Sequence, residues 1–172
     1  VGVEGFSCER PENVVSRQAE TVLAAVRIYR QCIEPHISDN PHCTSVDLVG
    51  FSAGGFLAYL LLCMAPQSAA SPRIGTLTLL SPRLEEAFVA DDKFVKMQTE
   101  ASGTRVFLGY GELENAKEDG TPFTQVASGI KKWLQPERLQ VRSYAMQGHT
   151  MPVEELQHVQ AFLSDAWQRI PQ

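Results

Sequence analysis

The segment that decides the fold reads Val46-Asp47-Leu48-Val49-Gly50-Phe51-Ser52-Ala53-Gly54-Gly55-Phe56-Leu57-Ala58. Its first half is apolar and β-branched, and its second half opens an apolar run, so we expect a strand over 45–51 and a helix over 53–64. Ser52 falls on the sharp turn between this strand and this helix, where a serine projects its hydroxyl from the carboxyl edge of a sheet. The glycines two positions before and after it let the neighbouring backbone segments pass without a clash. Ser52 is therefore the candidate nucleophile. The N–H of Ala53, at the start of the helix, is the candidate oxyanion donor.

The flanking sequence alternates strand and helix patterns. We expect strands over 75–80, 105–110 and 139–146, and the tail of another over Val1–Val3. Helical spacing covers 11–33 and 123–134 and resumes near Pro152, whereas 35–41 reads as a loop. This order predicts an α/β fold, a mostly parallel sheet with helices on both faces, in one domain over 1–172.

Residues 84–104 interrupt the alternation. They are rich in charge and show no clear strand, so we expect a lid or excursion there. Its apolar residues Phe88, Val89, Phe94 and Met97 either shape a substrate pocket or anchor a surface loop.

A nucleophilic serine needs a base, and in this fold the acid and then the histidine follow the serine along the chain. His149 comes directly after an expected strand, behind Gly148. His36 and His42 precede the serine in a Pro-bounded loop, and His158 lies within the last helix. His149 is therefore the candidate base.

The acid is sought after the strand that ends near Tyr110, where four carboxylates compete: Glu112, Glu114, Glu118 and Asp119. Glu114 comes far enough after the strand for the chain to turn back toward His149. Glu112 is expected to point to solvent or to cap the turn. Glu118 and Asp119 suit an exposed helix cap. We expect Glu114 to fix the imidazole tautomer and to stabilise the imidazolium.

These segments resemble the α/β-hydrolase superfamily, and most of all its hormone-sensitive-lipase-like carboxylesterase branch. The stretch 50–58 is similar to the G-D-S-A-G-G-N-L-A motif of that branch, and Leu79-Leu80-Ser81-Pro82 is similar to the Ser-Pro that ends its next strand. Residues 114–120 are similar to its acid motif D-P-L-R-D-E-G, and Gly148-His149 falls on its catalytic histidine. The resemblance implies that Ser52, Glu114 and His149 form a catalytic triad.

The chain departs from that branch in several places. Phe51 replaces an Asp, Phe56 replaces an Asn, and the acid is Glu rather than Asp. The His-Gly-Gly-Gly oxyanion loop and the N-terminal strands of the family are absent, so we expect a truncated or processed product. The source of the second oxyanion donor stays open, and losing one donor lowers activity by ~10²–10³.

Composition narrows the function classes. The net charge of −5 argues against nucleic acid or an anionic membrane as the main partner. No apolar run approaches the length of a transmembrane helix. The four cysteines match no metal-ligand spacing; Cys63 suits a packed thiol, and a disulfide among Cys8, Cys32 and Cys43 stays open. The compartment is undetermined, with a slight preference for the cytoplasm.

The expected activity is hydrolysis of a small-molecule carboxylic ester through an acyl-enzyme, without metal or cofactor. The alternatives are a thioesterase, acyltransferase or peptidase with the same triad, and a non-catalytic binding protein that keeps the Ser52 turn. The oligomeric state and the particular ester are open.

Overall fold

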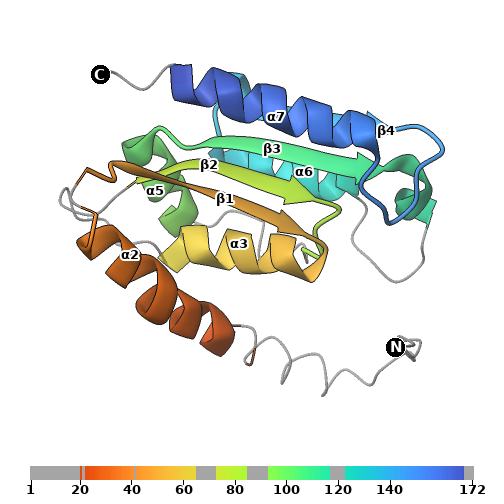
Figure 1. The fold of residues 1–172 in the computed structure, drawn as a ribbon. Helices are drawn as coiled ribbons and strands as arrows, with labels where there is room; N and C mark the ends of the chain where they lie inside the picture. The colour runs from red at the N-terminus through yellow and green to blue at the C-terminus, as the bar shows by residue number, and fades with distance from the viewer. Residues whose placement is uncertain are drawn as a thin grey trace.

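The computed structural model describes residues 20, 22–40, 42–64, 73–84, 93–116 and 123–168. Within these ranges the chain forms one parallel sheet in the order β1-β2-β3-β4 (Figure 1). Its strands are β1 (Ser45–Phe51), β2 (Arg73–Leu80), β3 (Arg105–Gly111) and β4 (Leu139–Tyr144). Because all strands are parallel, their carboxyl ends meet at one edge of the sheet.

Helices cover both faces of this sheet, as the sequence predicts. They are α3 (Ala53–Met64), α5 (Lys93–Ser102), α6 (Phe123–Trp133) and α7 (Val153–Gln168). Figure 1 shows α7 on one side of the sheet and α3 on the other. Side chains that alternate along β3 confirm the two layers. Val106 and Leu108 join the core under α3, α5 and α6, whereas Phe107 packs under α7 against Phe162.

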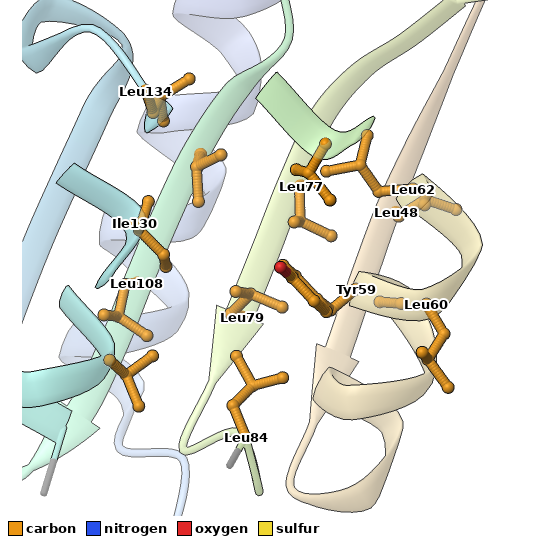
Figure 2. Close-up of a cluster of buried hydrophobic side chains, with 14 of the residues drawn as sticks. Leu48, Tyr59, Leu60, Leu62, Leu77, Leu79, Leu84, Leu108, Ile130 and Leu134 are labelled. Carbon is orange, nitrogen blue, oxygen red and sulfur yellow. The ribbon is translucent and has the colours of Figure 1, made fainter. Parts of the chain in front are cut away.

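The larger core lies between β1–β3 and the helices α3, α5 and α6. Figure 2 shows Tyr59 of α3 directed at the β2 residues Leu77 and Leu79, and all three are almost fully buried. The Tyr59 ring also meets the Trp133 ring of α6, with centroids 6.4 Å apart. Full burial of one such side chain stabilises the fold by roughly 1.5–3 kcal/mol. This core fixes β1 relative to α3, and so fixes the turn that carries Ser52.

The segment before β1 differs from expectation. Residues 22–28 are helical and continue through a π-helical turn, η1 (Tyr29–Ile33), into α2 (Glu34–Ser38). The loop expected over 35–41 is therefore wrong up to Ser38. Pro35 lies just after the π-helical turn, where η1 passes into α2, and the helical stretch continues past it.

Strand β4 ends at Tyr144, two residues before the expected end. Met146 has φ of 57°, a left-handed conformation that a strand cannot hold. The turn that follows carries the chain toward His149.

Part of the expected lid is a helix of the core. In α5, Val95 and Thr99 are fully buried, and the helix packs against α3, α6 and β2. Phe88 and Val89 lie outside the described residues, as does the strand expected over Val1–Val3. A lid over the rest of 84–104 and the domain limits 1–172 stay predictions.

Candidate active site

Ser52 lies between β1 and α3 in a backbone conformation that is unusual for a residue with a side chain. Its φ is 57°, in the left-handed region, which costs about 1–2 kcal/mol. Its backbone is held on the β2 side by two hydrogen bonds: the Ser52 N–H donates to the Leu80 carbonyl at 2.9 Å, and the Ser52 carbonyl accepts from the Arg83 N–H at 3.1 Å. The turn is thus anchored to the end of β2, and the Ser52 hydroxyl lies at the carboxyl edge of the sheet.

The glycines of this turn differ in how closely other atoms approach the position of a Cβ. A Cβ at Gly50 would collide with the carbonyl of Gly54, and a Cβ at Gly55 would come within 2.8 Å of the Pro82 Cβ. Nothing lies within 4 Å of a Cβ at Gly54. The close approach of α3 to β1 and to the segment after β2 therefore depends on Gly50 and Gly55.

His149 reaches the same edge from the loop after β4. Its Nε2 lies 2.8 Å from the Ser52 Oγ, and its ring stacks on Phe51 with centroids 4.8 Å apart. The loop is fixed to the end of β3, because the Leu113 N–H donates to the Gln147 carbonyl at 3.0 Å. A side chain at Gly111 would collide with the Gln147 carbonyl, so this loop also depends on a glycine.

Glu114 completes the chain of contacts. It lies on the short 3₁₀ helix η2 (Glu112–Ala116) that follows β3, and it is buried. Its Oε1 lies 3.1 Å from the His149 Nδ1 and accepts a hydrogen bond from the Ser81 Oγ at 3.1 Å. An ionised carboxylate only accepts, so a proton on the His149 Nδ1 satisfies this contact and leaves Nε2 to accept from the Ser52 hydroxyl.

The competing carboxylates and histidines lie elsewhere. Glu112 is exposed and accepts from the Ser143 Oγ at 3.0 Å. His36 and His42 are exposed, and the His158 Nδ1 contacts the Tyr144 hydroxyl at 3.1 Å. Glu118 and Asp119 lie outside the described residues.

Ala53, the expected oxyanion donor, is exposed and is the first residue of the twelve-residue helix α3. The backbone N–H groups of the first helical turn have no partner within the helix, and the helix dipole favours negative charge beside them. An oxyanion beside Ser52 would therefore lie at the positive end of α3.

Three side chains near these residues were not among the expected site residues. They are Phe51, which stacks on His149, Ser81, which donates to Glu114, and Glu155 of α7. Burial, together with the charge of Glu114, raises the pKa of Glu155 to about 7. Burial also raises the pKa of Tyr144 to about 12, and the charge of Glu155 adds to that rise.

The cysteines show no disulfide in the part of the chain that the structure describes. Cys32 and Cys43 carry free thiols, and Cys63 packs partly buried against the core as expected. Cys8 lies outside the described ranges. Among the described residues, no group of His, Cys, Asp or Glu side chains could hold a metal ion. No helix in these ranges is long and apolar enough to cross a membrane.

A cavity of about 390 Å³ opens at the other end of the sheet. It lies between the amino ends of β3 and β4, beside Arg105 and Arg138. The Arg105 guanidinium pairs with Asp165 at 2.8 Å, and Arg138 donates to the Thr99 carbonyl at 3.0 Å. This cavity takes no part in the site around Ser52.

No family model matches the sequence, and no curated protein matches it. Among solved structures, a variant of SOBER1 from Arabidopsis thaliana is similar, with 19% identity, a TM-score of 0.57, and coverage of 85% of this chain and 65% of that one. A carboxylesterase of the ammonia-oxidizing thaumarchaeon Nitrososphaera gargenis has 12% identity, a TM-score of 0.55, and coverage of 88% and 73%. The chain thus spans less than two thirds of the SOBER1 structure. At these identities the likeness establishes the fold alone, a parallel α/β sheet covered by helices.

Proposed function

We propose that this chain is the catalytic part of a serine hydrolase that cleaves a carboxylic ester, with Ser52, His149 and Glu114 as its triad. The observation that carries the proposal is the continuous set of contacts from the Ser52 Oγ to the His149 Nε2 at 2.8 Å, and from the His149 Nδ1 to Glu114 at 3.1 Å. These three side chains come from three different loops at one sheet edge, after β1, β3 and β4. A hydroxyl within hydrogen-bond reach of an oriented imidazole is what nucleophilic catalysis by serine requires.

The first half of the reaction follows from these positions. The Ser52 Oγ attacks the ester carbonyl carbon while His149 Nε2 takes the hydroxyl proton. The resulting oxyanion lies against the Ala53 N–H at the start of α3. When the tetrahedral intermediate collapses, the bond to the alcohol oxygen breaks and His149 returns its proton to that oxygen, leaving an acyl group on Ser52.

Water completes the cycle. It attacks the acyl carbonyl as His149 takes one of its protons, and the acid leaves as that proton passes back to the Ser52 Oγ. Glu114 keeps its negative charge throughout and stabilises the imidazolium that forms twice per turnover. Ser81 holds the same carboxylate oxygen in place.

The proposal is tested with short-chain p-nitrophenyl esters, comparing the wild-type protein with Ser52→Ala and with Ser143→Ala as a surface control. Hydrolysis in the wild type and the control, but not in Ser52→Ala, supports an esterase. A thioester with the same acyl group distinguishes an esterase from a thioesterase. If the thioester is hydrolysed faster than the oxygen ester, the substrate class is thioesters. Equal hydrolysis by Ser52→Ala and the wild type would contradict the proposal, and no hydrolysis above the uncatalysed background in either would favour a non-catalytic protein. The likeness to the hormone-sensitive-lipase-like branch remains a prediction.

A further inference from the structure

Glu155 is a buried carboxyl group that the proposed reaction does not use. It lies in the first turn of α7 and is 1% exposed. Its Oε1 packs against Gly109 of β3, where any Cβ would collide with it, and this oxygen has no hydrogen-bond partner. Buried carboxyls are normally paired or hydrogen-bonded, because burial of an isolated charge is costly. The position of Glu155 is therefore unusual.

The Glu155 carboxyl packs against the residue of β3 that binds Ser81, the serine that holds Glu114 of the proposed triad. Gly109, whose Cα faces the Glu155 carboxyl, accepts the Ser81 N–H with its carbonyl at 2.8 Å. The Ser81 hydroxyl in turn donates to Glu114. One residue of β3 thus separates Glu155 from the serine that holds the acid, and the negative charge of Glu114 acts on Glu155.

The groups that surround Glu155 determine the pH at which its carboxyl group ionises. No ion pair of Glu155 occurs among the described residues. On this face of the sheet Leu80 and Phe107 are apolar, and the buried Thr78 hydroxyl of β2, like the Glu155 Oε1, has no hydrogen-bond partner. The charge of Glu114 on η2 acts on Glu155, and the charge of Glu155 acts on Tyr144 of β4. Arg142 and Glu154 act on the same Tyr144, and His158 contacts it, whereas Arg105 of β3 pairs with Asp165 of α7. With a pKa near 7, Glu155 changes its charge within the range in which a histidine base works.

We propose that Glu155 is a positioning residue, which acts on the reaction at Ser52 by adding a second negative charge behind Glu114 when it loses its proton to solvent. The inference rests on the proposed function. Attack by Ser52 converts His149 into a cation, and a further negative charge on the same side stabilises that cation. With Glu155 neutral, Glu114 alone supplies this stabilisation. The proposed site thus has a slower form at acidic pH and a faster form at alkaline pH.

The rate at which a fluorophosphonate labels Ser52 tests this role between pH 5.5 and 9. The proteins compared are the wild type, Glu155→Gln, and Glu154→Gln as a matched control on the exposed side of the same turn. Below pH 6 all three label at equal rates, because Glu155 is neutral there. At pH 8.5 the wild type and Glu154→Gln exceed Glu155→Gln by about 3- to 10-fold. A Glu155→Gln profile parallel to that of the wild type would overturn the role of Glu155 while leaving the hydrolase proposal intact.

A second measurement needs no Glu155 variant and no activity. The ¹³C resonance of the Glu155 carboxyl in the wild-type protein reports its titration directly. Since the charge of Glu114 raises the pKa of Glu155, Glu114→Gln lowers this midpoint by about half a pH unit or more, whereas Glu112→Gln does not. An unmoved midpoint would overturn the coupling. Absence of label on Ser52 in all proteins would instead overturn the proposed function, and with it the role of Glu155.

Discussion

The hydroxyl of Ser81 donates to the Glu114 oxygen that faces His149. The Oγ–Oε1 distance is 3.1 Å, and both side chains are buried. Ser81 follows the last residue of β2 and has φ of 42°, whereas Glu114 lies on η2 after β3. Two neighbouring strands therefore fix the orientation of one carboxylate, which leaves Glu114 little freedom to turn away from the imidazole.

Removal of this hydrogen bond is expected to slow the proposed reaction. In Ser81→Ala, Glu114 loses a neutral donor to its charged oxygen, so kcat falls by about tenfold with KM nearly unchanged. Steady-state hydrolysis of p-nitrophenyl acetate measures both constants. Ser143→Ala removes the comparable bond to exposed Glu112 and leaves kcat unchanged. A full kcat in Ser81→Ala would show that Glu114 needs no such support.

The stacking of Phe51 on His149 leads to a second prediction. Aromatic contacts of this kind are worth about 0.5–1.5 kcal/mol, so Phe51→Leu lowers kcat by about 2- to 10-fold. The matched control is Phe123→Leu, which breaks the stacked pair with Tyr110, whose ring centroids lie 5.0 Å apart. The control lowers thermal stability but not kcat. Equal losses of kcat in the two variants would mean that Phe51 acts only through packing.

Two glycines of the Ser52 turn differ in what an added methyl group meets. Gly50→Ala drives a Cβ into the Gly54 carbonyl, so the free energy of unfolding falls by about 1–3 kcal/mol. Gly54→Ala meets nothing within 4 Å and lies in a helix, where alanine raises stability by up to about 1 kcal/mol. Urea unfolding measures both values. Equal effects of the two substitutions would contradict the tight approach of α3 to β1.

The raised pKa of Glu155 also predicts a pH-dependent stability. Its pKa is about 7 in the folded chain against an ordinary 4.5, so the folded state holds the extra proton between these values. The stability of the wild type relative to Glu155→Gln therefore falls as pH rises from 4.5 to 7 and is constant above, a total change of up to about 3 kcal/mol. Urea unfolding at pH 5, 6, 7 and 8 measures this difference. A difference that is flat with pH would show that Glu155 ionises as an exposed carboxyl does.

Most of the helices and strands can be predicted from the sequence, because local residue patterns determine where they begin and end. Strand β1 and helix α3 have the expected bounds, since a β-branched run and an apolar helix meet at a glycine-rich turn. The end of β4 was harder to predict, because the left-handed Met146 carries no glycine signal. Pro35 is read as a helix breaker from the sequence, so the helical stretch up to Ser38 is not expected; in the structure the proline follows a π-helical turn and the helix continues.

The supporting side chains of the site depend on contacts between distant strands. Ser81 and Glu114 are 33 residues apart, so their meeting follows from β2 lying beside β3, which sequence spacing alone does not fix. Glu155 did leave a signal: Glu155, Val159, Phe162 and Ala166 recur at helical spacing and form the buried face of α7. A carboxyl on an apolar stripe could thus have been found.

The pairing of Ser52 with His149 is tested most directly by the rate at which fluorophosphonate phosphonylates Ser52, located by peptide mass. In His149→Ala this rate is expected to fall at least about 100-fold, because no base then takes the hydroxyl proton. His158→Ala, which alters the partly buried histidine that contacts Tyr144, keeps the wild-type rate. Labelling of His149→Ala at the wild-type rate, or adducts at residues other than Ser52, would contradict the hydrolase proposal.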